Sequence, residues 1–213
     1  MSGKITAIEA QKWRKDRVSV FIDDEYAFSL QDILAARLKR GQMLSDQEIA
    51  SLRQQDAVES IYEKALHYLS FRPRSEQEMR RYLRDKGLDE GPSEQIVARL
   101  KRAHLVDDQD FAQFWVQSRQ MHRPRGRRAL RAELSRKGVP RDVIDGSIQD
   151  IDEEAQAFQA APTVAHRLAS LEQRVFFHRL LGYLQRRGFG YDVAIKVIRE
   201  LWKETSSERE MES

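Results

Sequence analysis

A run of basic residues in the middle of the chain has the composition of a phosphate-binding segment. Between Trp115 and Arg141 there are nine Lys or Arg residues and a single acid, Glu133. The run joins the expected end of one helix to the expected start of the next, so guanidinium groups and free helix amides point at one region of space. Both groups bind phosphate oxygens. We expect polyanion contacts from Arg119, Arg123, Arg125, Arg127, Arg128, Arg131 and Lys137.

A weaker version of this corner lies about fifty residues earlier, where an Arg-Pro-Arg triplet precedes a helix start at Ser75. Aromatic residues are not interleaved with the bases, so the expected contact is to a nucleic-acid backbone and not to base sequence. A run of charges can instead be a solvated helix face, and that alternative stays open. The assisting bases of this earlier corner are Arg72, Arg74, Arg80 and Arg81.

Catalytic and metal-binding patterns are missing from the sequence. It has no P-loop, no GxGxxG after a strand, no HExxH, no GxSxG and no cysteine. The nearest constellation is His104 with Asp107 and Asp108, which we interpret as a helix end followed by an Asp cap. We therefore expect a protein that is not an enzyme and that binds no metal or other cofactor.

Composition favours a mainly helical chain. Its 213 residues include only 10 Gly and 5 Pro, 33% are charged, and no window approaches the roughly 18 apolar residues of a membrane helix. The N-terminus has no apolar signal region, so the expected compartment is the cytoplasm. The net charge of +3 is unevenly placed: it is 0 over residues 1–56, +4 over 57–150 and −1 over 151–213.

The first 30 residues differ from the rest, because β-branched and aromatic residues cluster there in short runs. Strands are expected over Lys4–Glu9, Val18–Ile22 and Tyr26–Leu30, the last two forming a hairpin around an acidic turn. A short helix over about Gln31–Lys39, ended by Gly41, should follow.

Three glycines, Gly87, Gly138 and Gly188, mark an internal repeat with spacings of 51 and 50 residues. Each closes a segment with apolar residues three and four apart and is followed by an apolar residue and a second helix. A capping box at Ser75 to Glu78 opens the first such segment. Units of about fifty residues cannot bury their apolar faces alone, so the copies should stack into an elongated array.

These patterns divide the chain into five parts. We expect a β-hairpin with short helices over residues 1–56, repeat 1 over 57–106, the basic repeat 2 over 107–151, repeat 3 over 152–204 and an acidic flexible tail over 205–213. The fold class is mainly α: tandem repeats in a curved array behind a small β-hairpin extension. The opening of repeat 3 is the least regular part, because Pro162 interrupts it.

Four motifs in the same order resemble the RecX family of RecA regulatory proteins. The resemblance covers about residues 57–203, and the hairpin with Lys39-Arg40-Gly41 is similar to the N-terminal part of longer members. The motifs are Ala65-Leu66-x-Tyr68-Leu69-x-x-Arg72-Pro73-Arg74-Ser75-x-x-Glu78-Met79, Leu105-Val106-Asp107-Asp108-x-x-Phe111-Ala112, Arg125-Gly126 with Leu134-x-x-Lys137-Gly138, and Tyr183-Leu184-x-Arg186-Arg187-Gly188-Phe189.

The resemblance implies tandem three-helix repeats that bind the RecA–DNA filament in its helical groove. Members modulate RecA, usually inhibiting its ATPase, strand-exchange and coprotease activities in recombination, DNA repair and the SOS response, and they can bind DNA. It also implies a non-enzymatic protein with a basic middle repeat. One departure is that Phe177 and His178 stand where many members carry Lys or Arg. The resemblance therefore does not extend to basic contacts from these positions of repeat 3.

Two other functions stay open on the sequence. The chain could be a stand-alone, sequence-nonspecific DNA-binding module, or a protein adaptor whose acidic tail matters more than its bases. The expected partners are the RecA filament and DNA, single-stranded first and double-stranded second. We expect no membrane contact and a monomer.

Overall fold

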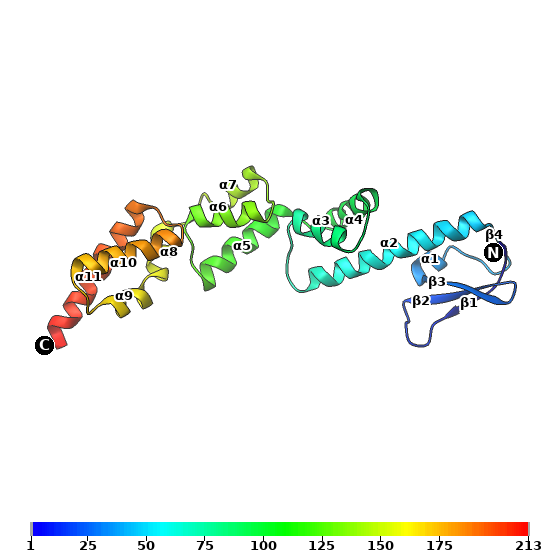
Figure 1. The fold of residues 1–213 in the computed structure, drawn as a ribbon, viewed down its shortest axis with the longest axis horizontal. Coiled ribbons are helices and arrows are strands. Elements are labelled where there is room, and N and C mark those ends of the chain that lie inside the picture. The colour runs from blue at the N-terminus through cyan, green and yellow to red at the C-terminus, as the bar shows by residue number, and fades with distance from the viewer. Residues whose placement is uncertain (1, 213) are drawn as a thin grey trace. The chain divides into compact units, whose positions relative to one another are not determined.

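The computed structural model describes the backbone of residues 2–212 and the side chains of residues 2–206. Figure 1 shows a small sheet near the N-terminus, followed by helices as far as the structure describes the chain, which confirms the mainly helical fold class. The chain divides into two compact units. The first comprises Met1–Arg72 and Arg80–Arg99, and the second comprises Pro73–Met79 and Leu100–Ser213.

The N-terminal sheet contains four antiparallel strands in the order β3-β2-β1-β4. The expected hairpin is confirmed, and its turn residues Asp23 and Asp24 have φ of 48° and 66°, the left-handed conformation that such tight turns need. The sheet is larger than expected because β4 pairs with the start of β1. The strands are β1 (Gly3–Ala10), β2 (Arg17–Ile22), β3 (Glu25–Gln31) and β4 (Met43–Leu44).

The helix expected over Gln31–Lys39 is shorter, and Gly41 is not its end. Helix α1 (Asp32–Ala35) stops because the chain turns back to the sheet. The Gly41 N–H donates to the Ile5 carbonyl, and the Ile5 N–H donates to Gln42. These tertiary hydrogen bonds override the local helical pattern.

Helix α2 (Asp46–Ser70) begins at a capping box formed by Ser45 and Glu48. Its first half packs on the sheet through Ile49, and its second half contributes the buried Tyr62 and Ala65. The expected boundary after residue 56 therefore falls inside one continuous helix.

Helices α3 (Glu76–Asp85) and α4 (Glu90–Arg102) follow α2. Tyr68 stacks on Tyr82 with ring centroids 4.2 Å apart, and Arg99 pairs with Glu59 at 2.7 Å. The second half of α2 thus packs with both later helices, as a three-helix repeat requires.

Repeat 2 is built from α5 (Asp108–His122), α6 (Arg127–Arg136) and α7 (Arg141–Ile148). Asp107 caps α5, as expected, by accepting from the N–H groups of Gln109 and Asp110. Leu130 and Leu134 of α6 are fully buried in a core shared with α5 and α7.

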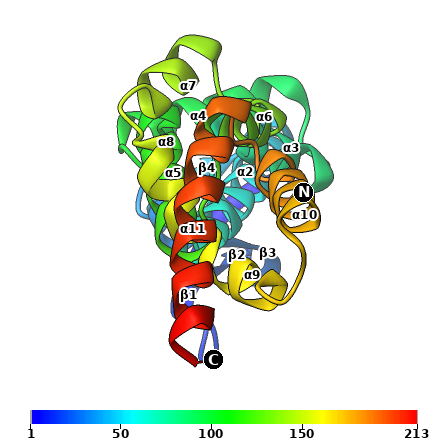
Figure 2. The ribbon, with the colours of Figure 1, turned by 90° about the vertical axis from the view of Figure 1, so that its left-hand side faces the viewer.

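Repeat 3 has four helices because Pro162 ends one and begins the next. They are α8 (Glu153–Ala160), α9 (Pro162–Leu168), α10 (Gln173–Arg186) and α11 (Tyr191–Glu212). Figure 2 shows α11 running past α8 and α10, and α11 contributes Val197 and Ile198 to the buried core of the repeat. The flexibility expected of residues 205–213 stays a prediction, because the side chains from 207 onward lie outside the described residues.

The three repeat glycines have the same backbone structure. Gly87, Gly138 and Gly188 have φ of 79°, 78° and 87°. In each case the glycine N–H and the next residue's N–H donate to carbonyls of the helix that ends there, the hydrogen-bond pattern of a Schellman motif. The internal repeat predicted from sequence is therefore present in the fold.

Candidate functional site

The N-terminus of α6 packs directly on the turn between α10 and α11. The Gly126 N–H donates to the Arg187 carbonyl at 3.0 Å. A Cβ on Gly126 would lie 2.3 Å from the Gly188 carbonyl oxygen, and a Cβ on Gly188 would lie 2.4 Å from the Ala129 Cβ. This Gly126–Gly188 joint between repeats 2 and 3 therefore requires glycine on both sides.

The N-terminus of α3 packs in the same way on the turn between α6 and α7. The Ser75 hydroxyl donates to the Lys137 carbonyl at 2.6 Å and accepts from the Glu78 N–H at 3.2 Å. A Cβ on Gly138 would overlap the side chain of Gln77. We call this the Ser75–Gly138 joint.

A carboxylate completes each joint at a corresponding place. The Asp108 side chain, at the start of α5, accepts from the Glu76 N–H at 2.9 Å. The Glu153 side chain, at the start of α8, accepts from the Arg127 N–H at 2.8 Å. Both acids thus hold an otherwise unpaired first-turn amide of the preceding repeat.

Several expected polyanion contacts are used inside the protein. The Arg119 Nε lies 2.8 Å from Glu133, and its guanidinium lies over the Trp115 ring at 4.4 Å. The Arg125 Nε lies 3.6 Å from the same Glu133 carboxylate. The single acid of the basic run therefore neutralises much of the charge of two of its bases.

Two further bases of the run hold the joints. Arg127 donates from Nη2 to the Ile151 carbonyl at 2.7 Å. Lys137 pairs with Glu78 at the Ser75–Gly138 joint. Both residues connect one repeat to the next. Each therefore has a structural role, whether or not it also binds a polyanion.

Three bases of repeat 2 face solvent. Arg123 and Arg128 are exposed, and in the described part of the chain no hydrogen bond or ion pair joins the side chain of either to another group. Arg131 pairs with Asp145 at 2.8 Å, but the two side chains are 57% and 60% exposed. Such surface pairs contribute little, so Arg131 can exchange this partner for another anion.

A groove of about 670 Å³ lies at the Gly126–Gly188 joint. Arg127, Arg128 and Arg131 line it together with Tyr191, which is 59% exposed. Cationic forks beside an exposed ring suit a phosphate with its adjoining sugar or base. The other lining residues are Glu153, Gln185, Gly188, Phe189 and Gly190.

None of the bases of the earlier Arg-Pro-Arg corner lines this groove. Arg72, Arg80 and Arg81 belong to the first unit, whereas Arg74 belongs to the second. Arg80 binds both carboxylate oxygens of Glu94, and Arg81 is exposed. The structure thus brings Arg127, Arg128 and Arg131 into one groove and does not add these four residues to it.

Sequence reasoning missed Tyr191 and the carboxylates of the joints. Tyr191 stands three residues after Gly188, so an extension of the repeat comparison past the glycine could have found it. The pairing of Glu153 with a backbone amide has no such signal, because it joins residues 26 positions apart.

Burial perturbs one carboxylate of the joints. It raises the pKa of Asp108, while the Glu76 N–H that this carboxylate accepts and the nearby Lys101 act in the opposite direction. In the Ser75–Gly138 joint, the ionised form of the Asp108 carboxylate is therefore less favourable than it would be in water.

The described residues contain no group of three His, Asp or Glu side chains placed to hold a metal ion. His104, three residues before the cap residue Asp107, has a left-handed φ of 53°, in agreement with a helix end. Within residues 2–212, no helix has the length and apolar character needed to cross a membrane.

Family models match most of the chain outside its last repeat. Residues 3–45 match the regulatory protein RecX N-terminal domain, residues 62–100 the first RecX three-helix domain and residues 107–147 the second.

Individual relatives agree with these matches. The chain is 31% identical to the regulatory protein RecX of Bacillus pumilus over 98% of its own length and 81% of the relative's. It is 37% identical to that of Amycolatopsis mediterranei over 75% of the chain and 93% of the relative. A crystal structure of a regulatory protein RecX superposes with a TM-score of 0.78 at 26% identity, covering 92% of this chain and 98% of the other. The RecX of Lactobacillus salivarius gives 0.62 at 25% identity, covering 69% and 97%.

Proposed function

This chain belongs to the RecX family of regulatory proteins, and we propose that it is a non-catalytic regulator that binds the RecA–DNA filament in its groove. We infer that it inhibits the ATPase, strand-exchange and coprotease activities of RecA in recombination, DNA repair and the SOS response. In this proposal it works as a cytoplasmic monomer, without a cofactor.

The observation that carries the proposal is the groove at the Gly126–Gly188 joint. Arg128 and Arg131 reach solvent there beside Arg127, whose guanidinium is anchored to a carbonyl. Arg forks bind phosphate oxygens in pairs, and their affinity does not depend on base sequence. A filament whose DNA follows a helical groove offers phosphates of this kind along its length.

The joints supply the mechanism of inhibition. Glycine contacts at Gly126 and Gly188 leave no space for repeats 2 and 3 to slide over each other. If such a connected pair of repeats contacts two neighbouring RecA subunits, it opposes the relative motion that ATP turnover requires.

A DNA-binding module that acts without RecA is the second candidate, because the same groove would bind bare DNA. In that case the affinity for naked single-stranded DNA should equal the affinity for RecA-coated DNA. A protein adaptor would instead keep its effect on RecA after the groove bases are removed.

The test compares two double variants of repeat 2. Arg128→Ala/Arg131→Ala removes groove bases, and Arg136→Ala/Arg141→Ala removes two exposed bases that do not line the groove. Binding to bare and RecA-coated oligo-dT is measured at several salt concentrations, together with RecA ATPase activity.

We expect the groove variant to lose inhibition and to reduce the log–log salt slope for single-stranded DNA by about 1.4, since two phosphate contacts are removed. The control variant should change both much less. RecA ATPase activity that saturating wild-type protein leaves unchanged would contradict the proposed function.

A further inference from the structure

The loop between β1 and β2 carries the most exposed large hydrophobic side chain of the described residues. Trp13 is 96% exposed, whereas Trp115 and Trp202 are half-buried. Figure 1 shows this loop projecting from the end of the sheet, and Trp13 takes no part in the core beneath it. A free indole ring gains much by contact with a flat partner, so the loop is a candidate for binding one.

Positive charges surround Trp13 in the loop. Its chain neighbours are Lys12 and Arg14, Lys15 follows, and all three side chains are exposed. Arg14 pairs with Asp16 at 3.2 Å, but the two side chains are 57% and 43% exposed, so the pair is weak. Within the described residues no carboxylate pairs with Lys12 or Lys15. The ring therefore stands among cations that are available to an anionic partner.

The structure holds the loop in shape at both of its ends. The Gln11 N–H donates to the Arg17 carbonyl and the Arg17 N–H donates to the Arg14 carbonyl, each at 3.0 Å. The Gln11 side chain donates to the Ser29 hydroxyl at 2.8 Å, and Arg17 pairs with Asp56 at 2.7 Å. A loop that is already ordered loses less conformational entropy when it binds.

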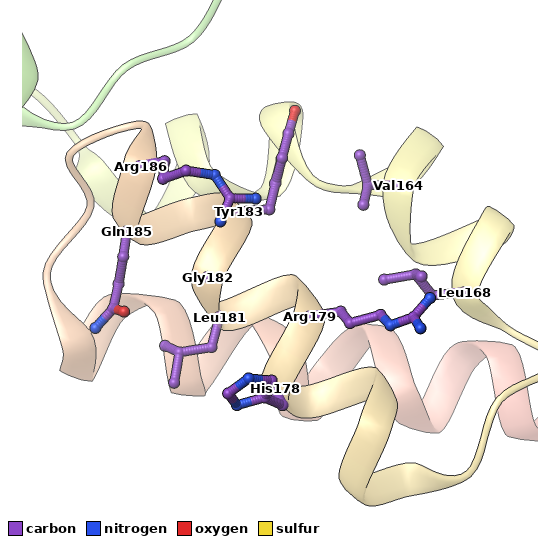
Figure 3. A pocket seen from close by; sticks show the side chains of 9 residues that line it. All are labelled: Val164, Leu168, His178, Arg179, Leu181, Gly182, Tyr183, Gln185 and Arg186. Atoms are coloured by element: carbon purple, nitrogen blue, oxygen red, sulfur yellow. The ribbon is translucent and has the colours of Figure 1, made fainter.

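The groove between α9 and α10 is a cationic surface of a different kind. It has a volume of about 440 Å³, and Figure 3 shows Arg179 and Arg186 reaching from α10 toward α9. Its tyrosine, Tyr183, is half-buried and donates its hydroxyl to the Ala160 carbonyl at 3.0 Å. The Arg187 guanidinium lies 4.9 Å from the centre of the same ring. This groove therefore offers cations but no exposed indole or phenol ring.

An exposed ring between cations fits a single strand of nucleic acid. Unpaired bases stack on aromatic side chains while Lys and Arg contact the backbone. A nucleotide whose base lies on Trp13 has its phosphates within reach of Lys12 and Arg14, which are direct chain neighbours of the ring. A lipid surface fits less well, because segments that insert into it present several apolar residues together, and the neighbours of Trp13 are charged.

We propose that the β1–β2 loop binds single-stranded DNA by stacking Trp13 on an unpaired base, with Lys12 and Lys15 on adjoining phosphates. This inference rests on the proposed function, in which the chain binds DNA in the RecA filament, and it gives the N-terminal sheet a part in that binding. The groove at the Gly126–Gly188 joint contacts phosphates whatever the base, whereas the loop requires a base.

Two oligomers with the same number of phosphates, oligo-dT and an abasic oligomer, test the stacking. Trp13→Ala should weaken binding to oligo-dT by about fivefold or more, the lower end of a stacking contribution. Its binding to the abasic oligomer should stay within about twofold of the wild type. Trp13→Phe keeps a ring and should retain most of the affinity. Because Trp13 lies outside the core, both variants should have the melting temperature of the wild type.

Control variants separate the ring from the charges. Tyr26→Ala removes a 59% exposed ring of the same sheet that stands next to Glu25 and not among cations, and it should bind both oligomers as the wild type does. Arg179→Ala removes a cation that has no exposed indole or phenol ring beside it, so any loss should be equal for both oligomers. Lys12→Ala/Lys15→Ala should reduce the log–log salt slope by about 1.4, whereas Trp13→Ala should leave the slope unchanged.

Fluorescence gives a direct readout of the contact. The chain has three Trp residues, and only Trp13 is almost fully exposed. Saturating oligo-dT should quench part of the wild-type fluorescence by stacking on Trp13. This quenching should be missing from Trp13→Phe, although that variant still binds.

Equal losses of Trp13→Ala on the two oligomers, or no loss on either, would overturn the inference while leaving the proposed function standing. A wild-type protein that binds oligo-dT but neither binds nor inhibits the RecA filament would overturn the proposed function, whereas the stacking would still be measured on bare oligo-dT. Binding to phosphatidylglycerol vesicles that Trp13→Ala abolishes, with oligo-dT binding unchanged, would assign the loop to a lipid surface and contradict the inference.

Discussion

The Ser75–Gly138 joint and the Gly126–Gly188 joint share a backbone plan but differ in side-chain chemistry. The first is closed by polar side chains, with the Ser75 hydroxyl on a carbonyl and Lys137 paired with Glu78. The second is closed by backbone against backbone at two glycines, with the Glu153 carboxylate accepting from the Arg127 N–H beside them. At the first joint Lys137 is neutralised within the protein, whereas Arg128 and Arg131 at the second joint reach solvent.

This difference teaches that the count of basic residues is a poor guide to a binding surface. Arg119 and Arg125 belong to the same basic run as Arg128, yet both lie against Glu133. What distinguishes Arg128 is its exposed place on the rim of the Gly126–Gly188 joint, where no carboxylate of the described residues pairs with its side chain.

The largest expected effect comes from the three repeat glycines. Gly188→Ala should destabilise the protein by about 2–5 kcal/mol, because it combines left-handed strain with overlap against Ala129. Gly87→Ala has the same strain but open space around it, and should cost about 1–2 kcal/mol. Urea denaturation measures both.

Gly138→Ala should fall between these two, because its neighbour is the flexible side chain of Gln77 and not backbone. Equal losses for all three glycines would mean that the joints do not contribute to stability, and the comparison of joints would then fail.

Removing the acid of the basic run should have the next largest effect. Glu133→Gln weakens the hold on Arg119 and on the Trp115 indole N–H, which donates to this carboxylate at 2.8 Å. We expect a loss of about 1–3 kcal/mol in the free energy of unfolding. Under the proposed function, affinity for single-stranded DNA should rise at low salt because two guanidinium groups are released.

Asp145→Asn is the control for this variant. It releases Arg131 from a solvent-exposed pair, so the free energy of unfolding should change by less than about 1 kcal/mol. If Asp145→Asn destabilised the protein as much as Glu133→Gln, the exposed pair of Arg131 would contribute as much to stability as the partly buried pair of Arg119. The distinction between exposed and paired bases would then fail.

Removing the polar contact of Ser75 in the Ser75–Gly138 joint should lower the stability of the protein by a smaller amount. Ser75→Ala removes both a helix cap and the hydrogen bond to the Lys137 carbonyl, for an expected loss of about 1–2 kcal/mol. Ser45→Ala removes a cap that takes part in no joint and should cost less. Thermal unfolding of the two variants side by side measures the contribution of the joint.

The smallest expected effect is a stabilisation, and it comes from replacing Asp108. Because burial raises the pKa of Asp108, the folded protein binds this proton more tightly than the unfolded chain, and stability falls as pH rises through the raised pKa. At pH 7 the charged form is the costly one. Asp108→Asn, which keeps an oxygen to accept from Glu76, should therefore raise the melting temperature slightly at pH 7.

That gain should vanish well below the unfolded Asp pKa of about 3.9, where Asp108 is protonated in both states. A melting temperature that is lower than that of the wild type at pH 7 would show that the carboxylate's hydrogen bond outweighs its burial.

Sequence alone predicted the parts of the fold that local patterns determine. The three glycines could be placed because a left-handed residue that ends a helix, followed by an apolar residue, leaves the same pattern in each repeat. The hairpin of β2 and β3 was predictable from its alternating residues and its acidic turn. Strand β4 and the early end of α1 depend on hydrogen bonds to Ile5, which no local pattern records.

The candidate site was predictable only in outline. The basic run showed where cations gather, but their pairing depends on which side chains the helices bring within reach. Glu133 meets Arg119 across a distance of 14 residues in sequence, and Tyr191 joins the groove from the next repeat. The phosphate-binding role of the eleven predicted bases stays a prediction.

Helix α2 gives the first unit a mechanical property that its separate contacts do not suggest. Near its middle the helix is anchored to the sheet, where Asp56 accepts from both Arg17 and the Gln31 N–H. Further along, it is anchored to α4, where the Arg99 guanidinium lies 3.6 Å from the centre of the Tyr62 ring. Because α2 is one continuous helix shared by the sheet and repeat 1, unfolding of the sheet also weakens the packing of repeat 1. The N-terminal sheet and repeat 1 should therefore unfold together, as one cooperative block.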